Sequence, residues 1–394
     1  MQISYTTALY LSAIFTLLVV PRALQRFRLP AQLTCFALGI VVAIVDKPLT
    51  QDHVARVVAT LGIASLFLVA GLEVDLVEIR RQRPRLSVHL AIRTLFLGII
   101  AWCAMRYMHM QWQPATLLAL GLLTPSTGFI LDTLPHSGLA VSEQSEVAMN
   151  SIASEIIALA VLFIVSKSAS MTTLATSGLI LLLLVVLTPL LFLLLGKFVV
   201  PYAPGSEFSL LLMVGIMCAV ITQNLGVHYL IGAFTAGLIA GLLGKRMATL
   251  ASPANLQAVR LFASFFIPFY FFHEGLEVPT GSLVLRSLLY GGLLSLVLIP
   301  VRIAKNWLQA RYISHRDVRG AFRVSIALVP TLIFTLVIAG MMRQMFHIED
   351  ALYGGLLVYA AITTLLPSLI LPMLKMDSPI DTQAAADLDG PIMS

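Results

Sequence analysis

The chain is a succession of long apolar segments separated by short loops that carry most of its basic residues. About 20 apolar residues is the length that an α-helix needs to cross the hydrocarbon core of a membrane. A transmembrane β-barrel would instead require short strands of alternating hydrophobicity. The sequence therefore predicts an all-α polytopic membrane protein with about thirteen helices. We place these helices near residues 5–20, 30–46, 57–76, 86–108, 115–133, 144–166, 172–199, 207–225, 227–243, 257–276, 282–305, 319–343 and 351–375.

The distribution of charge agrees with membrane insertion and predicts its direction. Charged residues make up 11% of the chain, whereas soluble domains carry about 25%. The net charge of +6 comes mostly from loop residues, so we expect the lipid bilayer, and no nucleic acid, as the partner surface. Loops after odd-numbered helices, with their flanks, hold sixteen Lys or Arg residues, and the other loops hold six. The positive-inside rule then predicts an external N-terminus and a cytoplasmic C-terminus.

Three short sequence patterns recur in the same order in the two halves of the chain. Gly71 and Pro125 are 54 residues apart, and Gly275 and Pro330 are 55 apart. Matching segments lie seven helices apart and so cross the membrane in opposite directions, which is typical of the inverted repeats of secondary transporters. The paired segments are FALGI (36–40) with FTAGL (234–238), AGLEVDL (70–76) with EGLEVPT (274–280), and LLTPSTGF (122–129) with ALVPTLIF (327–334).

This pattern divides the chain into a transmembrane domain, residues 1–375, and a short polar tail. We expect a first repeat of six helices over about 5–166, a linking helix over about 172–199, and a second repeat over about 207–375. The tail, residues 376–394, is mostly polar and is expected to be cytoplasmic, without a regulatory domain.

Pro125 and Pro330 interrupt two apolar helices at corresponding positions. Proline removes a backbone donor and frees a carbonyl, which lipid cannot satisfy. Two interrupted helices at corresponding places are the best sequence pointer to a transport site. We expect them to cross at mid-membrane, although both prolines could instead only kink packed helices. The hydroxyl residues beside the breaks are Thr124, Ser126, Thr127 and Thr331.

Glu155 lies midway along the sixth predicted helix, directly after Ser154. An ionisable residue at this depth costs about 2.5–3.5 kcal/mol on insertion scales and is a functional candidate by default. Its counterpart in the second repeat is Ala360, so the acid is not a structural feature of both repeats. A carboxylate can bind either a proton or an alkali cation. We predict a cation/proton site made by Glu155, Ser154 and the hydroxyls of the first break; the alternative is an acid paired with a neighbouring base for packing.

Several other ionisable residues lie within or near predicted spans. Arg302 can pair with Glu155 or compensate the charge of a broken-helix terminus, and the alternative is an arginine that extends to the interface. For Arg93 and Arg323 we expect a topological or packing role. Asp132 is equally compatible with a loop cap and with a cation funnel.

No metal or cofactor site is expected. His273-Glu274 begins like a zinc-protease motif. The motif requires a second His four residues after the first, and that position is occupied by Glu277. Glu277 and its repeat partner Glu73 are expected to cap helices or lie at the interface, and the alternative is that they line a vestibule. The cysteines lie far apart in apolar segments, at Cys35, Cys103 and Cys218.

Taken together, these motifs resemble the cation:proton antiporter superfamily with the sodium/proton exchanger fold, in particular the bacterial branch that includes Kef-type potassium/proton systems. The resemblance covers about residues 5–375. It depends on the order and spacing of FLVAGLEVDL (67–76), TPSTGFIL (124–131), SEIIAL (154–159), GAFTAGLIAG (232–241) and a basic residue in the eleventh helix.

The resemblance implies exchange of Na⁺ or K⁺ for H⁺ by an elevator-type alternating-access cycle. Predicted helices 4–6 and 11–13 would form a moving core, and helices 1–3 and 8–10 a scaffold that forms a homodimer in the bacterial inner membrane. Two departures stand out: many relatives carry an acidic or polar pair ending in Asp where this chain has Ser154-Glu155, and often Lys where it has Arg302. A single carboxylate implies electroneutral exchange.

Other functions remain open at this stage. A second inverted-repeat carrier, such as a bile-acid or organic-anion transporter, would share the repeat and the broken helices. A sensor module could keep this fold without transport. A channel would need a continuous pore, and the sequence shows no nucleophile–base set for a membrane enzyme.

Overall fold

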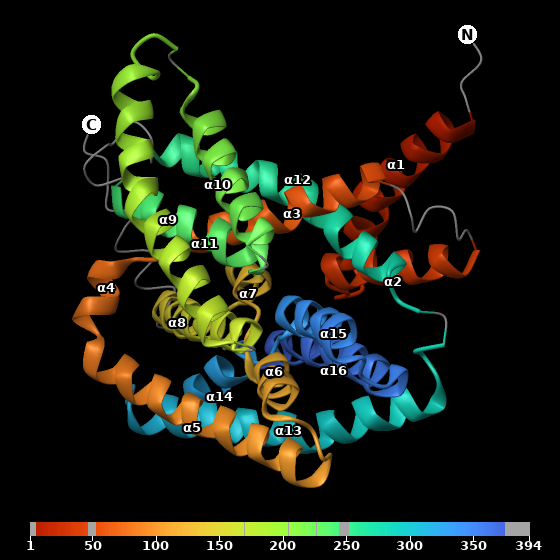
Figure 1. Ribbon diagram of the computed structural model, residues 1–394. Helices are drawn as coiled ribbons and strands as arrows, with labels where there is room; N and C mark the ends of the chain where they lie inside the picture. The colour runs from red at the N-terminus through yellow and green to blue at the C-terminus, as the bar shows by residue number, and fades with distance from the viewer. Residues whose placement is uncertain are drawn as a thin grey trace, which may run out of the picture.

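A computed structural model describes residues 5–45, 53–168, 170–203, 205–225, 227–243, 252–279 and 281–374. The described chain is helical throughout (Figure 1). Its α-helices are α1 (Tyr5–Gln25), α2 (Ala31–Val45), α3 (His53–Leu72), α4 (Leu76–Arg81), α5 (Arg83–Tyr107), α6 (Trp112–Leu123), α7 (Thr127–Thr133), α8 (Val141–Lys167), α9 (Met171–Phe198), α10 (Glu207–Asn224), α11 (Tyr229–Leu243), α12 (Pro253–Leu276), α13 (Leu285–Tyr312), α14 (Val318–Ala327), α15 (Leu332–Phe346) and α16 (Asp350–Ile370). Two 3₁₀ turns follow α7 and α16, at Leu134–His136 and Leu371–Leu374.

The predicted number of spans is confirmed for the described residues. Ten helical segments are long and apolar enough to cross a membrane, if each interrupted helix is counted once. Three shorter apolar helices, at Leu11–Gln25, Ala31–Ile44 and Tyr229–Leu243, bring the total to thirteen. The polar tail at 376–394 lies outside the described residues.

The predicted helix boundaries differ from those of the structure mainly where charged or polar residues extend a helix or start a new one. The third helix ends at Leu72 and not at 76, because the Asp75 side chain accepts hydrogen bonds from the backbone of Val77 and Glu78 and starts the separate helix α4. Helix α13 continues to Tyr312, seven residues past the predicted end at 305. Its last turns are polar, so hydropathy alone does not reveal them.

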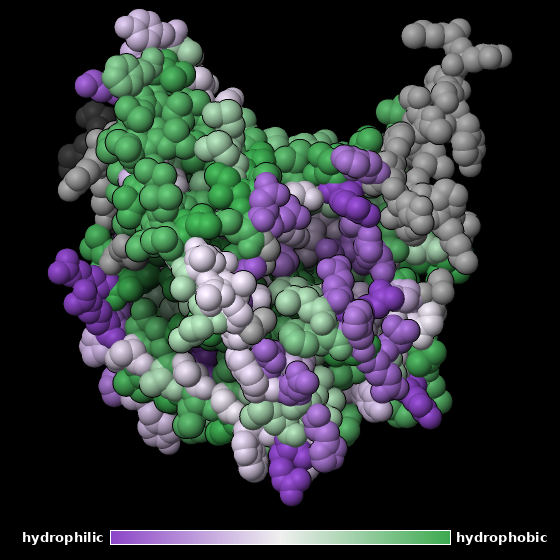
Figure 2. Space-filling view, viewed as in Figure 1, coloured by the Kyte–Doolittle hydropathy of each residue, from purple (hydrophilic) through white to green (hydrophobic). Residues whose placement is uncertain are grey.

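The helices pack in two groups (Figure 1). Helices α1, α2, α3, α10, α11 and α12 form one group, here called the panel bundle. Helices α5–α8 and α13–α16 form the other, here called the crossed bundle because both interrupted helices lie in it. The two groups meet where α7 packs against α3 and α8 against α11. Helix α9 lies beside α10 and α11, and side chains on this side form a broad apolar surface (Figure 2).

In the panel bundle, glycines of the predicted repeat let helix backbones touch. A Cβ atom on Gly39 of α2 would collide with the α12 backbone at Phe272, and one on Gly275 of α12 with the α2 backbone. The repeat partners make the same contact, since a Cβ on Gly237 of α11 or on Gly71 of α3 would collide with the other helix. Close approach of this kind is characteristic of small residues in membrane helices. The contacts of α2 with α12 and of α11 with α3 are therefore equivalent.

Two ion pairs of the panel bundle follow the same symmetry. Arg260 Nη2 at the start of α12 lies 2.9 Å from Glu73 Oε1 after the end of α3. Arg56 Nη2 at the start of α3 lies 3.9 Å from Glu277 Oε1 after the end of α12. Arg56 and Arg260 are 204 residues apart, as are Glu73 and Glu277. These acids therefore join α3 and α12 at both ends, and the equivalent pairs support the predicted inverted repeat.

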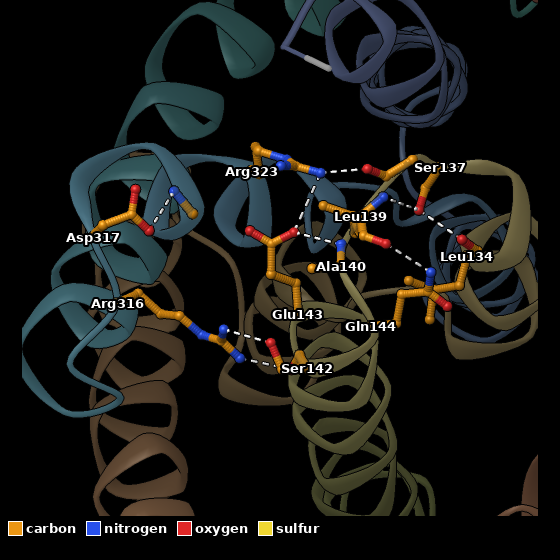
Figure 3. Close-up of polar contacts among 12 residues, drawn as sticks. Leu134, Ser137, Leu139, Ala140, Ser142, Glu143, Gln144, Arg316, Asp317 and Arg323 are labelled. Carbon is orange, nitrogen blue, oxygen red and sulfur yellow. Dashed lines mark hydrogen bonds and ion pairs between the residues drawn. The ribbon is translucent and has the colours of Figure 1, made fainter. Parts of the chain in front are cut away.

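In the crossed bundle, the start of α8 is held to the start of α14 by buried polar contacts (Figure 3). Glu143 Oε2 accepts from the Ala140 amide at 2.8 Å and lies 3.3 Å from Arg323 Nη2, which also donates to the Gly138 carbonyl. Beside this pair, Arg316 Nε donates to Glu146 Oε2 at 2.8 Å. Arg323, expected to have a topological or packing role, is thus a buried partner of Glu143.

Candidate ion-binding site

The two interrupted helices cross at their breaks and are hydrogen-bonded to each other there. Helix α6 ends at Leu123 and α7 begins at Thr127, while α14 ends at Ala327 and α15 begins at Leu332. The Ser126 amide donates to the Pro330 carbonyl at 2.8 Å, and the Ile333 amide donates to Ser126 Oγ at 3.3 Å. Pro125 and Pro330 therefore break their helices, and the alternative of simple kinks is excluded.

The carbonyls that the first break frees are satisfied from the crossed bundle. Pro125 cannot donate to the Gly121 carbonyl, which accepts instead from Thr335 Oγ1 at 2.8 Å. The next carbonyl, that of Leu122, accepts from the Tyr359 hydroxyl at 2.8 Å. Irregular backbone is tolerated at this depth because protein groups replace the lost helical bonds.

Each first half-helix ends against a buried arginine. Arg93 of α5 donates to the Leu123 carbonyl at 3.4 Å and to Thr124 Oγ1 at 3.0 Å. Arg302 of α13 donates to the Leu328 carbonyl at 3.1 Å and to the Tyr359 hydroxyl at 2.9 Å. The two carbonyls are 205 residues apart, the same separation as the two prolines. The positive charges thus lie at the negative ends of α6 and α14, where they are stabilising.

Glu155 lies beside the break, buried and incompletely partnered. Its side chain is 2% exposed. Within the described part of the chain, neither Glu155 Oε2 nor the Thr127 hydroxyl has a hydrogen-bond partner, although the hydroxyl is close enough to interact with the carboxyl. Buried polar atoms without partners are rare in native proteins and require an explanation. Two adjacent oxygens of this kind can accept a cation or, at the carboxyl, a proton.

The predicted site residues lie on two faces of α8. Ser154 Oγ is 3.4 Å from Nε2 of His89 on α5, whereas Glu155, about 100° further round the helix, lies beside Thr127 at the start of α7. Helix α7 packs on the panel bundle, where Gly128 lies against Leu66. The acid therefore lies toward the junction of the two bundles, and the Ser154 side chain lies away from it.

The remaining predicted residues serve the breaks. Thr124 Oγ1 donates to the Leu120 carbonyl at 2.6 Å, and Thr331 Oγ1 lies 3.1 Å from Thr363 Oγ1. Asp132, outside the break, accepts from Gln32 Nε2 at 2.8 Å and so joins α7 to α2.

Two residues that contact the breaks were not predicted as part of the site. The Tyr359 hydroxyl accepts from Arg302 and donates to the Leu122 carbonyl at the first break. A tyrosine in an apolar helix does not by itself indicate such a contact. Arg93 could have been found from the repeat, because it and Arg302 are internal arginines of the fourth and eleventh predicted helices, which the repeat pairs.

Crossed, interrupted helices in the two halves of an inverted repeat are typical of secondary transporters. The chain belongs to the sodium/hydrogen exchanger family, because the family model "Sodium/hydrogen exchanger, transmembrane" matches residues 12–376. The predicted resemblance to the cation:proton antiporter superfamily is thereby confirmed at the level of the family, and the chain belongs to a transporter family and not to a class of enzymes.

Individual proteins to which the chain is similar are also antiporters by name. The chain is 23% identical over 377 residues to the "Probable Na(+)/H(+) antiporter 3" of Methanocaldococcus jannaschii, covering 93% of this chain and 95% of that protein. It is similar in fold to the sodium proton antiporter MjNhaP1 from the same organism at pH 8, with a TM-score of 0.65 and 13% identity over 93% of this chain and 96% of that one. An electron-microscopy structure of MjNhaP1 gives a TM-score of 0.60 and 14% identity, with both chains fully covered.

Proposed function

We propose that this protein exchanges a monovalent cation, Na⁺ or K⁺, for H⁺, and that Glu155 is the shared binding site. The observation that carries the proposal is the pair of buried, unpartnered oxygens at Glu155 and Thr127 beside the crossed helices. A relative in the family carries the name of a Na⁺/H⁺ antiporter. A carboxylate that holds either ion, but not both, couples the two fluxes.

We further propose a one-for-one, electroneutral exchange. Within the described residues, no cluster of three or more His, Cys, Asp or Glu side chains could hold a metal ion, and Glu155 is the one acid placed at the crossing. With either a cation or a proton bound, the site has the same charge. Membrane potential, which contributes about 2.3 kcal/mol per charge per 100 mV, would then not drive the exchange.

The two-bundle packing supports an elevator-type cycle in which the crossed bundle moves against the panel bundle and carries Glu155 with it. The hydrogen bond between Asp132 and Gln32 links the two bundles and would have to break during such a movement. We also propose the orientation given by the loop charges, with the C-terminus in the cytoplasm of a bacterial inner membrane, and a homodimer.

The test is exchange in proteoliposomes with a pH-sensitive dye, on addition of Na⁺, K⁺ or Li⁺. Wild type is expected to move protons in response to at least one cation, and Glu155→Gln to none. Glu349→Gln, which changes an exposed acid at the start of α16, serves as a control for reconstitution. Exchange by Glu155→Gln at the wild-type rate would refute the assignment. A rate that follows a voltage imposed with valinomycin would refute one-for-one exchange.

A further inference from the structure

A small cavity lies between α5, α8 and α13, on the Ser154 face of α8. Its volume is about 20 Å³, which is enough for a single particle of the size of water or slightly larger. Three basic side chains line it, from Arg93, Arg302 and Lys305, together with His89, and none of its lining residues is an acid. The cation-binding oxygens proposed above belong to the other face, so this is a separate feature of the molecule.

The two arginines have acceptors, but the lysine does not. Arg93 and Arg302 each donate to the carbonyl end of a half-helix, whose partial negative charge offsets part of their own. In the described part of the chain no hydrogen bond or ion pair involves Lys305. Arg93 Nε is also buried without an acceptor. The cavity is therefore lined by a lysine amine without an acceptor and by one free guanidinium donor.

We propose that this cavity binds a small monovalent anion, of the size of chloride, between Lys305 and Arg93. Arg93 is buried and Lys305 is partly buried, and basic side chains removed from water are ordinarily paired, because desolvation of a lone charge is costly. A volume that holds about one water-sized particle favours a small anion over a polyatomic one. Its remaining walls include Phe96 and Leu123, and an apolar lining suits a weakly hydrated halide.

A second cavity adjoins the first on the same side of the crossed bundle, and Glu146 is among its lining residues. This second cavity of about 30 Å³ shares His89 and Asn306 with the first. It is lined by Gln82 and Arg85, at the start of α5, and so extends toward the end of the bundle that the loop charges predict to be cytoplasmic. The bound anion neutralises Lys305 next to the breaks, and this inference does not depend on which cation, if any, Glu155 carries.

The direct test is diffraction from crystals of the full chain grown with bromide in place of chloride. A bromide peak in the anomalous difference map is expected in the cavity, in contact with Lys305 Nζ and Arg93 Nε. The crystals are grown at a bromide concentration that saturates the rise in melting temperature. A cavity that contains only water under these conditions would overturn the proposal.

The second test is the melting temperature of the detergent-purified protein in chloride and in gluconate, at constant cation concentration. A ligand that binds only the folded state raises Tm in a saturable way. We expect chloride to raise the Tm of wild type, and Lys305→Met to lose this increment while melting in gluconate at or above wild type, because an unpaired charge is gone. The matched control is Arg286→Gln, an exposed position on the same helix, which should keep the increment. An equal increment in Lys305→Met, or none in wild type, would overturn the proposal.

Discussion

The buried ion pair between Glu143 and Arg323 allows a prediction of stability with a stated magnitude. Glu143 Oε2 and Arg323 Nη2 are 3.3 Å apart, and the two side chains are 6% and 7% exposed. Glu143→Gln keeps the shape of the side chain but removes its charge. Arg323 would then remain buried without a carboxylate at the contact between α8 and α14 (Figure 3).

Removing one partner of a buried ion pair costs about 3–5 kcal/mol. Two contacts reduce this value here. Arg323 keeps its bond to the Gly138 carbonyl, and the amide oxygen of glutamine can still accept from the Ala140 amide. A net contribution of about 1 kcal/mol for each of these two hydrogen bonds leaves an expected loss of about 1–3 kcal/mol. Arg323→Met in the same chain should recover most of this loss, because replacing a buried pair by apolar side chains is often neutral.

The assay is the unfolding free energy of the purified protein in a double-mutant cycle of Glu143→Gln and Arg323→Met. Glu349→Gln, an exposed acid at the start of α16, is the control and should change stability by less than about 0.5 kcal/mol. If the two single losses simply add in the double variant, the residues are not coupled. In that case the reasoning from distance and burial would be wrong.

Three further outcomes are expected. Tyr359→Phe removes the hydroxyl that the first break uses and should lower stability by about 1–3 kcal/mol in the same unfolding assay, since a buried carbonyl loses its donor. Thr127→Val removes the hydroxyl beside Glu155 and should raise the apparent KM for the transported cation with little change in Tm; an unchanged KM would contradict its role as a ligand. Gly71→Ala should lower the yield of folded protein because its Cβ would collide with α11, whereas Gly98→Ala, which meets open space, should not.

Much of the fold could be predicted because the membrane restricts the possibilities. Every backbone polar group must be satisfied inside the protein, so apolar length predicts helices and the two prolines predict breaks. The repeat then placed Pro125 and Pro330 at one crossing. Three roles were open for Arg302, namely pairing with Glu155, compensation at a broken-helix terminus and extension to the interface. The structure shows its guanidinium on the Leu328 carbonyl at a helix end.

The sequence did not reveal the directions in which the side chains of the site point. Ser154 and Glu155 are neighbours in the sequence, yet one lies toward His89 and the other toward Thr127. Hydropathy carries no information about this, because rotation of a helix by a few tens of degrees leaves its apolar length unchanged. A topological or packing role was expected for Arg93 for the same reason, because its contacts with the Leu123 carbonyl and Thr124 depend on the direction of its side chain.

The two halves of the repeat share several contacts but differ at Glu155, and this difference bears most directly on the proposed transport. The glycine contacts, the Glu73 and Glu277 ion pairs and the arginine at each half-helix end occur twice. The acid occurs once, because the counterpart of Glu155 is Ala360, which is fully buried. A second acid at the crossing would add about 2.5–3.5 kcal/mol to the cost of insertion and would demand a second cation or proton for neutrality. Under the proposed function, the symmetric contacts therefore stabilise the fold, and the single unsymmetric carboxylate sets the exchange at one cation for one proton.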